Sequence, residues 1–296
     1  MRPDLLLAVQ KRTLLFDGGL GTQLQARGLP VGSSPELWNQ LHPDQIAAVH
    51  QDYLKAGAEI LTTNSFGGSP KKLQMDKVSG DPEEINLIAA RIAREAAGER
   101  AWVAGSVGPT GVILALGDQS EAEIQAGFEQ QTRGLARGGA DFILLETMSD
   151  LGEALLAVRG AQAGCALPIF ASFTFSPGQR GYRTLMGNSI PEVAAALANA
   201  GVAGMGCNCG TGIEDAIAIV QEIRRVWSGP VLAEPNAGLP QWVDGMMRYN
   251  ETPEKMAAQL PGLIAAGASA VGGCCGTTPA HILAFHKVLM EMHQDD

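Results

Sequence analysis

The sequence predicts a single α/β domain over residues 1–296, a TIM barrel of the (β/α)8 class, and three observations support this fold. Short β-rich apolar runs alternate eight times with amphipathic helical patterns. Composition does not change along the 296 residues, 46% of which are hydrophobic, so one large core is expected. Four segments, KAGAEILTTN, RGGADFILLET, NAGVAGMGCN and AAGASAVGGC, share one plan in which a helix ends at glycine and a buried strand follows.

Each expected strand is a short apolar run followed by an amphipathic segment. In chain order the strands are Thr13–Asp17, Glu59–Asn64, Trp102–Val107, Phe142–Thr147, Ile169–Phe175, Ala203–Cys209, Val231–Asn236 and Ser269–Cys274. The helical patterns lie at about residues 43–56, 83–97, 121–138, 150–163, 190–200, 213–226, 252–266 and 279–292. A doubly wound open sheet is the alternative, but the turn DGGLGT after the first strand lacks the G-x-G-x-x-G spacing of dinucleotide sites.

The chain carries 21 Lys and Arg against 31 Asp and Glu, a net charge of −10. Nucleic acids and anionic membranes attract clustered basic residues, so neither is expected as a partner. The N-terminal apolar run LLLAV is too short for a signal peptide, and no stretch approaches the roughly 18–20 apolar residues of a membrane span. We therefore expect a cytoplasmic protein, whose five cysteines, two of them adjacent, indicate metal binding or catalysis rather than disulfides.

Cysteines stand at the ends of the sixth and eighth expected strands, where barrel enzymes collect their chemistry. Cys209 lies in GCNCG, and Cys274 and Cys275 lie in GGCCG, two strands away on a closed barrel. Three cysteine ligands with an open fourth position are typical of a catalytic zinc site; buried free thiols or a strained Cys-Cys disulfide are the alternatives. By strand alternation Cys207 points the same way as Cys209 and could line the pocket or be a spare ligand, whereas Cys165 is expected in the core.

The expected ligand set indicates which reaction the site performs. Zinc held by three thiolates has a formal charge of about −1, which makes it a poor Lewis acid for activating water. Such a centre can still deprotonate an incoming thiol and leave its sulfur nucleophilic. The pattern therefore favours alkyl transfer to a thiol over hydrolysis.

Polar residues at other strand ends are candidates for binding a substrate. Asp17 and Glu146 each follow a run of apolar strand residues, so a carboxylate pair at the pocket mouth could hold an ammonium group. The alternatives are a turn or N-cap role for Asp17 and a barrel arginine as partner of Glu146. Asn64 and Asn236 are explained by a role in a turn about as well as by a role in binding a ligand. The glycine turn that begins at Gly18 could accept a carboxylate on its backbone amides.

With these residues laid out, the chain resembles the homocysteine S-methyltransferase family. That family includes the homocysteine module of cobalamin-dependent methionine synthase, the betaine–homocysteine methyltransferases and the S-methylmethionine-dependent enzymes. The resemblance runs in order across about residues 13–290 through DGGLGT, TTNSFGG, GSVGPTG, ETMSD, GCNCG, EPNAGLP and GGCCGTTPAHI.

The resemblance implies a (β/α)8 barrel with zinc on Cys209, Cys274 and Cys275. It places the amino end of homocysteine near the carboxylates of Asp17 and Glu146, and it suggests that Asn236 approaches the zinc when substrate is absent. Cys207 stands where the family usually has an apolar residue.

We therefore expect a zinc-dependent homocysteine S-methyltransferase that forms methionine. The methyl donor is either a small betaine-type or sulfonium molecule or a methylcorrinoid, which would reside on a separate corrinoid protein. One alternative is the catalytic subunit of a multi-protein corrinoid methyltransfer system. Another, from a different class, is a non-catalytic barrel that binds zinc or thiols.

Overall fold

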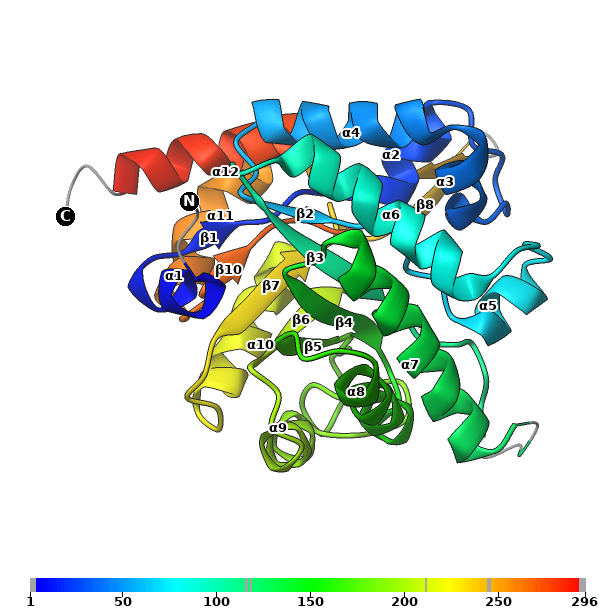
Figure 1. Ribbon diagram of the computed structural model, residues 1–296. Helices are drawn as coiled ribbons and strands as arrows, with labels where there is room; N and C mark the ends of the chain where they lie inside the picture. Colours follow the sequence, from blue (N-terminus) through cyan, green and yellow to red (C-terminus); the bar gives the residue numbers. More distant parts are fainter. Residues whose placement is uncertain (1–3, 115–116, 118, 211, 244–245, 293–296) are drawn as a thin grey trace.

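Eight parallel strands form one sheet that curves into a barrel. The computed structural model describes residues 4–114, 117, 119–210, 212–243 and 246–292. The strands are β1 (Leu14–Leu15), β2 (Ile60–Thr62), β3 (Trp102–Val107), β4 (Phe142–Met148), β5 (Ile169–Phe173), β6 (Gly204–Cys209), β7 (Val231–Pro235) and β10 (Ala270–Val271). Their order is β1-β10-β7-β6-β5-β4-β3-β2, and a parallel bridge between Phe16 and Ile60 closes the ring. The predicted (β/α)8 barrel is therefore confirmed (Figure 1).

A helix forms from each expected helical pattern and covers the outside of the barrel. These helices are α4 (Pro43–Lys55), α6 (Pro82–Ala97), α7 (Glu121–Gly138), α8 (Leu151–Gly164), α9 (Ile190–Asn199), α10 (Ile213–Arg224), α11 (Pro253–Ala265) and α12 (Pro279–Met292). Local sequence fixes where they start. Ser120 and Ser189, for example, form capping boxes with Glu123 and Glu192 at the first turns of α7 and α9.

Alternation along the strands makes the inside of the barrel apolar at one end and polar at the other. At the amino end the ring of Phe142 meets those of Phe16 and Phe170 edge-on, with centroids 6.2 and 5.2 Å apart. Two residues further along the same inward faces, polar side chains follow apolar ones: Thr62 after Ile60, Ser106 after Ala104, Glu146 after Leu144 and Glu234 after Leu232. The carboxyl ends of the strands therefore present polar groups above a packed floor.

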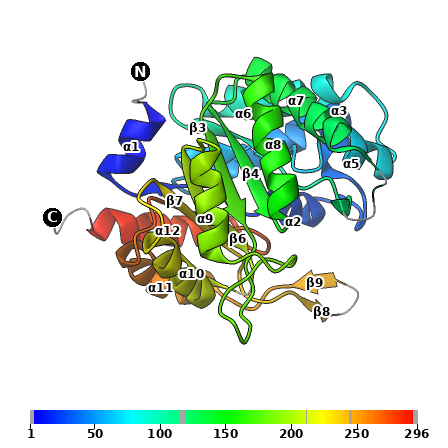
Figure 2. The ribbon, with the colours of Figure 1, turned by 90° about the horizontal axis from the view of Figure 1, so that it is seen from below.

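Short elements that the sequence reading missed complete the barrel. Helix α1 (Leu5–Lys11) covers the amino end, where Leu5, Ala8 and Val9 join the inner core. The others are α2 (Leu20–Ala26), the 3-10 helix η1 (Pro35–Leu37), α3 (Trp38–Leu41), α5 (Pro70–Met75) and the antiparallel hairpin of β8 (Gln241–Val243) with β9 (Met246–Arg248). Figure 2 shows this hairpin standing out from the barrel. Segments of three to seven residues are too short for hydrophobic periodicity to reveal them.

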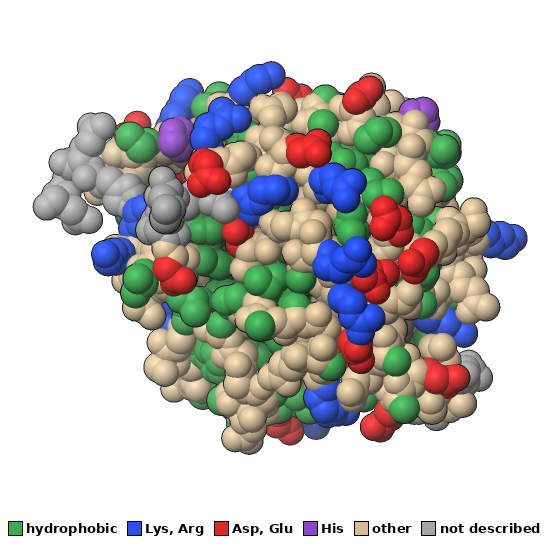
Figure 3. All heavy atoms as spheres, viewed as in Figure 1, with side chains coloured by type: hydrophobic (Ala, Val, Ile, Leu, Met, Phe, Trp, Pro, Cys, Tyr) green, Lys and Arg blue, Asp and Glu red, His purple; other side chains and the backbone are tan. Residues whose placement is uncertain are grey.

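Surface character agrees with the composition. Within the described ranges, no helix is long and apolar enough to cross a membrane. On the face that Figure 3 shows, basic and acidic side chains are intermixed rather than gathered by sign.

Candidate active site

A cavity of about 550 Å³ lies at the carboxyl ends of the barrel strands. Its walls include the ends of β2, β3, β4, β6 and β7, the turns that follow β1 and β10, and parts of the segment from residue 18 to residue 36. Most residues that the sequence singled out line it: Asp17, Gly18, Asn64, Glu146, Cys209, Cys274 and Cys275. Cys207 and Asn236 are not among the lining residues.

Three cysteine sulfurs come together on one wall of the cavity. The Sγ atoms of Cys209 and Cys274 are 3.0 Å apart, those of Cys274 and Cys275 are 4.0 Å apart, and all three lie within 4.8 Å of one another. Sulfurs that share a tetrahedral zinc ion with bonds of about 2.3 Å are about 3.8 Å apart, so small shifts would fit this donor set to zinc. All five cysteines are free thiols, so the Cys274–Cys275 disulfide is not formed.

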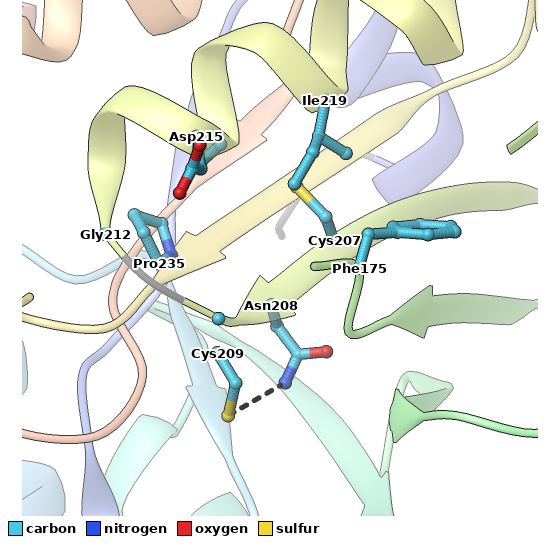
Figure 4. Close-up of a pocket in the computed structure, with 10 residues that line it drawn as sticks. Phe175, Cys207, Asn208, Cys209, Gly212, Asp215, Ile219 and Pro235 are labelled. Atoms are coloured by element: carbon cyan, nitrogen blue, oxygen red, sulfur yellow. Dashed lines mark hydrogen bonds between the residues drawn. The ribbon is translucent and has the colours of Figure 1, made fainter. Parts of the chain in front are cut away.

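Backbone geometry decides which cysteine of β6 joins the cluster. Cys207 faces outward into the apolar layer beneath the helices, next to Ile219 of α10, and burial raises the pKa of its thiol to about 12. Simple alternation would send Cys209 the same way, but its φ of +60° is in the left-handed region and turns the side chain into the cavity. Figure 4 shows the two thiols on opposite sides of the strand. The expectation that both point the same way is wrong, and Cys207 is a core residue, as is the half-buried Cys165.

Hydrogen bonds within the cluster favour the thiolate form of Cys275 and the protonated forms of Cys209 and Cys274. The thiols of Cys209 and Cys274 and the hydroxyl of Tyr249 donate hydrogen bonds to Cys275, which lowers the pKa of Cys275 to about 3. Hydrogen bonding within the cluster, together with burial, holds the pKa of Cys274 well above its usual range. Tyr249 follows β9, and its sequence context, MMRYN, carries no signal that would have predicted a place beside the thiols.

The carboxyl groups of Asp17, which is buried, and of Glu146, which is partly buried, lie at the same cavity. Asp17 accepts hydrogen bonds of 2.8 Å from the backbone N–H and from the hydroxyl of Thr62, while Gly19 is the N-cap of α2. Glu146 accepts a hydrogen bond from the hydroxyl of Ser106, not from an arginine. Burial raises the pKa of each to about 7, and the charge of Glu146 adds to the shift of Asp17, as expected for neighbouring carboxyl groups.

A third buried carboxyl group, Glu234, was missed by the sequence reading. It is 6% exposed, lines the cavity, and its Oε2 has no hydrogen-bond partner within the described part of the chain. Burial, then the charges of Glu146 and Asp17, raise its pKa well above the usual range. The signal was present, because Glu234 follows the apolar run VLA just as Asp17 follows TLLF. The sequence predicts a strand that ends at Asn236, whereas pairing stops at Pro235.

The remaining predicted residues have contacts of their own. A side chain on Gly18 would place its Cβ 2.7 Å from Thr277 Oγ1, so only glycine fits this approach. Asn64 donates from its amide to the carbonyl of Pro35 at 2.8 Å, which fastens the segment before α3 to the end of β2. Asn236 donates to the carbonyl of Gly210 at 3.0 Å, and its Oδ1 is buried without a partner among the described residues.

Fold and site together define a class: a (β/α)8 barrel with a thiol and carboxyl cavity at the carboxyl ends of its strands. Residues 14–289 match the homocysteine S-methyltransferase family. The chain belongs to that family, as its motifs had indicated.

Relatives of known name span the same barrel. The chain is 34% identical to methionine synthase of Mycobacterium tuberculosis and 33% identical to that of Mycobacterium leprae, over 94% of its own length. It covers 25% and 24% of those proteins, so it spans about a quarter of their length. The crystal structure of the homocysteine methyltransferase MmuM from Escherichia coli, in its metallated form, matches with a TM-score of 0.79 at 28% identity, over 97% of this chain and 99% of MmuM. Its apo form gives 0.75 at 27% identity.

Replacing Asp17 by asparagine should stabilise the metal-free protein at neutral and higher pH. Burial raises the pKa of Asp17 from 3.8 to about 7, so the folded chain binds the proton more tightly than the unfolded chain. Stability is therefore lost as pH rises from about 4 through about 7, and Asp17→Asn removes a loss on the order of a few kcal/mol. Thermal denaturation in chelator between about pH 5 and pH 8 measures the difference.

The exposed Glu95 of α6 offers the control, because Glu95→Gln changes a carboxyl group of the same kind in water. This substitution should leave the pH dependence of unfolding as it is. An Asp17→Asn protein with the same pH dependence as the unsubstituted protein would contradict the burial of a charge at this position.

Proposed function

We propose that this chain binds one zinc ion through Cys209, Cys274 and Cys275 and transfers a methyl group to the sulfur of homocysteine, forming methionine. The observation that carries the proposal is the convergence of three thiols and three carboxyl groups on one cavity. The names of the relatives, methionine synthase and homocysteine methyltransferase, support the same reaction.

Zinc held by these thiolates would supply a site where an incoming thiol loses its proton while its sulfur stays nucleophilic. The three cysteines line the cavity, so a zinc ion that they held would be open to it, and the cavity has room for a small amino acid beside them.

Asp17 and Glu146 are proposed to bind the ammonium group of homocysteine. Each oxygen of Asp17 accepts one hydrogen bond from Thr62 and keeps a second lone pair, and the Oε2 of Glu146 is free of the hydrogen bond from Ser106. An arriving ammonium ion favours their charged forms and so offsets the cost of burying them. This pairing fixes the substrate at the end opposite its thiol.

The charge of the cavity favours a positively charged methyl donor. Five acidic side chains line it, whereas Lys72 is the one basic side chain among the described lining residues and its Nζ is 2.7 Å from Asp76. Phe66, which is 38% exposed, offers an aromatic face to the same space. A sulfonium or quaternary ammonium donor would be attracted there. In the transfer, a lone pair of the homocysteine sulfur would form the new bond to the methyl group. The pair of the broken bond would stay on the donor, whose onium centre would thereby become neutral.

A methylcorrinoid on a separate protein is the second candidate donor. The similarity to a quarter of mycobacterial methionine synthase favours it, because the matched segment is there part of a longer protein. The two donors differ in charge and size, so they can be separated by experiment.

Cys275→Ala should abolish both zinc binding and methionine formation, because it removes the best-stabilised thiolate of the cluster. Loss of one of the three proposed cysteine ligands would lower the affinity for zinc by orders of magnitude. Metal content after dialysis, together with methionine formed from homocysteine, measures the effect. Cys165→Ala is the matched control, since that thiol lies on the core away from the cavity. Wild-type turnover in Cys275→Ala would refute the zinc mechanism.

Glu146→Gln should raise the KM for homocysteine at least about tenfold, because an ion-paired hydrogen bond contributes about 1.5–3 kcal/mol. The discriminating substrate is 4-mercaptobutanoate, which has the same thiol and carboxylate without the amino group. Its KM should change by less than about threefold, since it lacks the group that Glu146 binds. Equal losses for both substrates would mean that Glu146 does not bind the ammonium.

Small onium donors should methylate homocysteine in the presence of the zinc-loaded protein, and Phe66→Leu should reduce kcat/KM for them by about 3- to 30-fold through loss of the cation–π contact. The assay compares betaine, S-methylmethionine and free methylcobalamin as sole donors. Methionine from methylcobalamin alone, unaffected by Phe66→Leu, would support the corrinoid donor instead.

A further inference from the structure

The residue before Cys209 has more contacts at the site than any role described so far requires. The side chain of Asn208 points into the barrel, 3% exposed, beside Glu234 in the register of β6 with β7. We propose that Asn208 is a positioning residue that links the thiol cluster, through Cys209 at the end of β6, to the end of β4, where the proposed substrate-binding residue Glu146 lies. The inference rests on the proposed function, because it concerns how the same metal site is held.

The oxygen of Asn208 holds the end of β4. Its Oδ1 accepts hydrogen bonds from the backbone N–H of Thr147 at 2.8 Å and from the hydroxyl of Ser172 at 2.9 Å. The pairing of β4 with β5 is interrupted between Leu145 and Met148, so the amide of Thr147 uses this side chain in place of a ladder partner. Glu146 lies within the same interruption.

The residues on both sides of this link have an unusual backbone conformation. Thr147 has φ +59° and Cys209 has φ +60°, both in the left-handed region that glycine favours, and Thr147 is β-branched. Such conformations persist where surrounding contacts over-determine them. Asn208 contacts both residues, and at Cys209 the conformation is what turns the thiol into the cavity.

The nitrogen of Asn208 faces the sulfurs. Its Nδ2 donates to Thr147 Oγ1 at 2.7 Å, and it lies 3.8 Å from the Sγ of Cys209 and 4.0 Å from that of Cys274. An amide has two N–H groups, so one holds Thr147 while the other is shared by the two sulfurs. Figure 4 shows the amide nitrogen directed at Cys209. A neutral donor at this place stabilises negative sulfur without adding a positive charge or occupying a ligand position.

Asparagine supplies both the hydrogen-bond acceptor and the hydrogen-bond donor with one side chain. Its oxygen accepts two hydrogen bonds from the strands on one side, while its nitrogen donates toward the sulfurs on the other. Aspartate would keep the acceptor but turn a second carboxylate oxygen toward the thiolates. Asn208→Asp therefore separates the two halves of the proposed role at almost unchanged size.

The test is zinc affinity, measured by competition with a chromophoric chelator, together with the thiolate-to-metal absorption of the cobalt-loaded protein. Asn208→Asp is expected to weaken zinc binding by about 10- to 100-fold, as for other groups that orient metal ligands, and to shift the cobalt spectrum. Asn86→Asp is the matched control. Asn86 is equally buried and donates to the carbonyls of Gly68 and Pro82, outside the site, so its variant should lose stability but keep zinc affinity within about threefold.

Thr147→Gly keeps the inference testable if Asn208→Asp does not fold. Glycine adopts a φ of +59° without strain, so the backbone should be no less stable, but the amide of Asn208 loses the hydroxyl that anchors it. Zinc affinity should fall at least about threefold. Wild-type zinc affinity and cobalt spectrum in the folded variants would overturn the inference alone, whereas absence of zinc from the unsubstituted protein would overturn the proposed function as well.

Discussion

Burying three thiols and three carboxyl groups around one cavity places like charges together, and the local structure of the site depends on how those charges are relieved. Without positive partners the carboxyl groups of Asp17, Glu146 and Glu234 keep their protons up to neutral pH or beyond, because burial and mutual repulsion raise their pKa values. Hydrogen bonds from Thr62 and Ser106 offset only part of that cost. The cavity is thus complementary to cations, and the proposed ligands, a metal ion and an ammonium group, are both cations.

The apolar amino end of the barrel offsets the free-energy cost of such a site. Its inner floor of aromatic and aliphatic side chains, covered by α1, needs no polar group, and a second apolar layer separates the strands from the helices. The left-handed residues Thr147 and Cys209 cost about 1–3 kcal/mol each. That strain is small against burial of several large side chains, each of which contributes about 1.5–3 kcal/mol. A rigid floor therefore supports a strained rim, where one sulfur from the end of β6 meets two from the turn after β10.

The fold was predictable because it depends on repeated local signals, whereas part of the site depends on exceptions to them. Eight apolar runs, proline starts and glycine ends placed the long helices within two residues of their observed bounds. Alternation failed at Cys209, because no periodic pattern reveals a single positive φ. Glu234 was missed because the expected strand ran one residue past its observed end and placed Asn236 there, and Tyr249 reaches the sulfurs from a segment with no pattern at all. Asp17, Glu146 and the three cysteines could be found from sequence because each lies at the end of an apolar run, whereas the positive φ of Cys209 and the position of Tyr249 could not.

Charge also bears on how a reaction at this site would finish. Under the proposed function homocysteine enters as a thiol, reacts as an anionic sulfur and leaves as a neutral thioether. A thioether is a much weaker partner for a metal than a thiolate, so the sulfur end of the product would be the more weakly held, and the proposed contacts of its ammonium group with Asp17 and Glu146 would remain. An onium donor would become neutral in the same step and lose its attraction to the acidic walls. Both products then bind less tightly than their precursors, so the electrostatics that assemble the reactants also favour their departure.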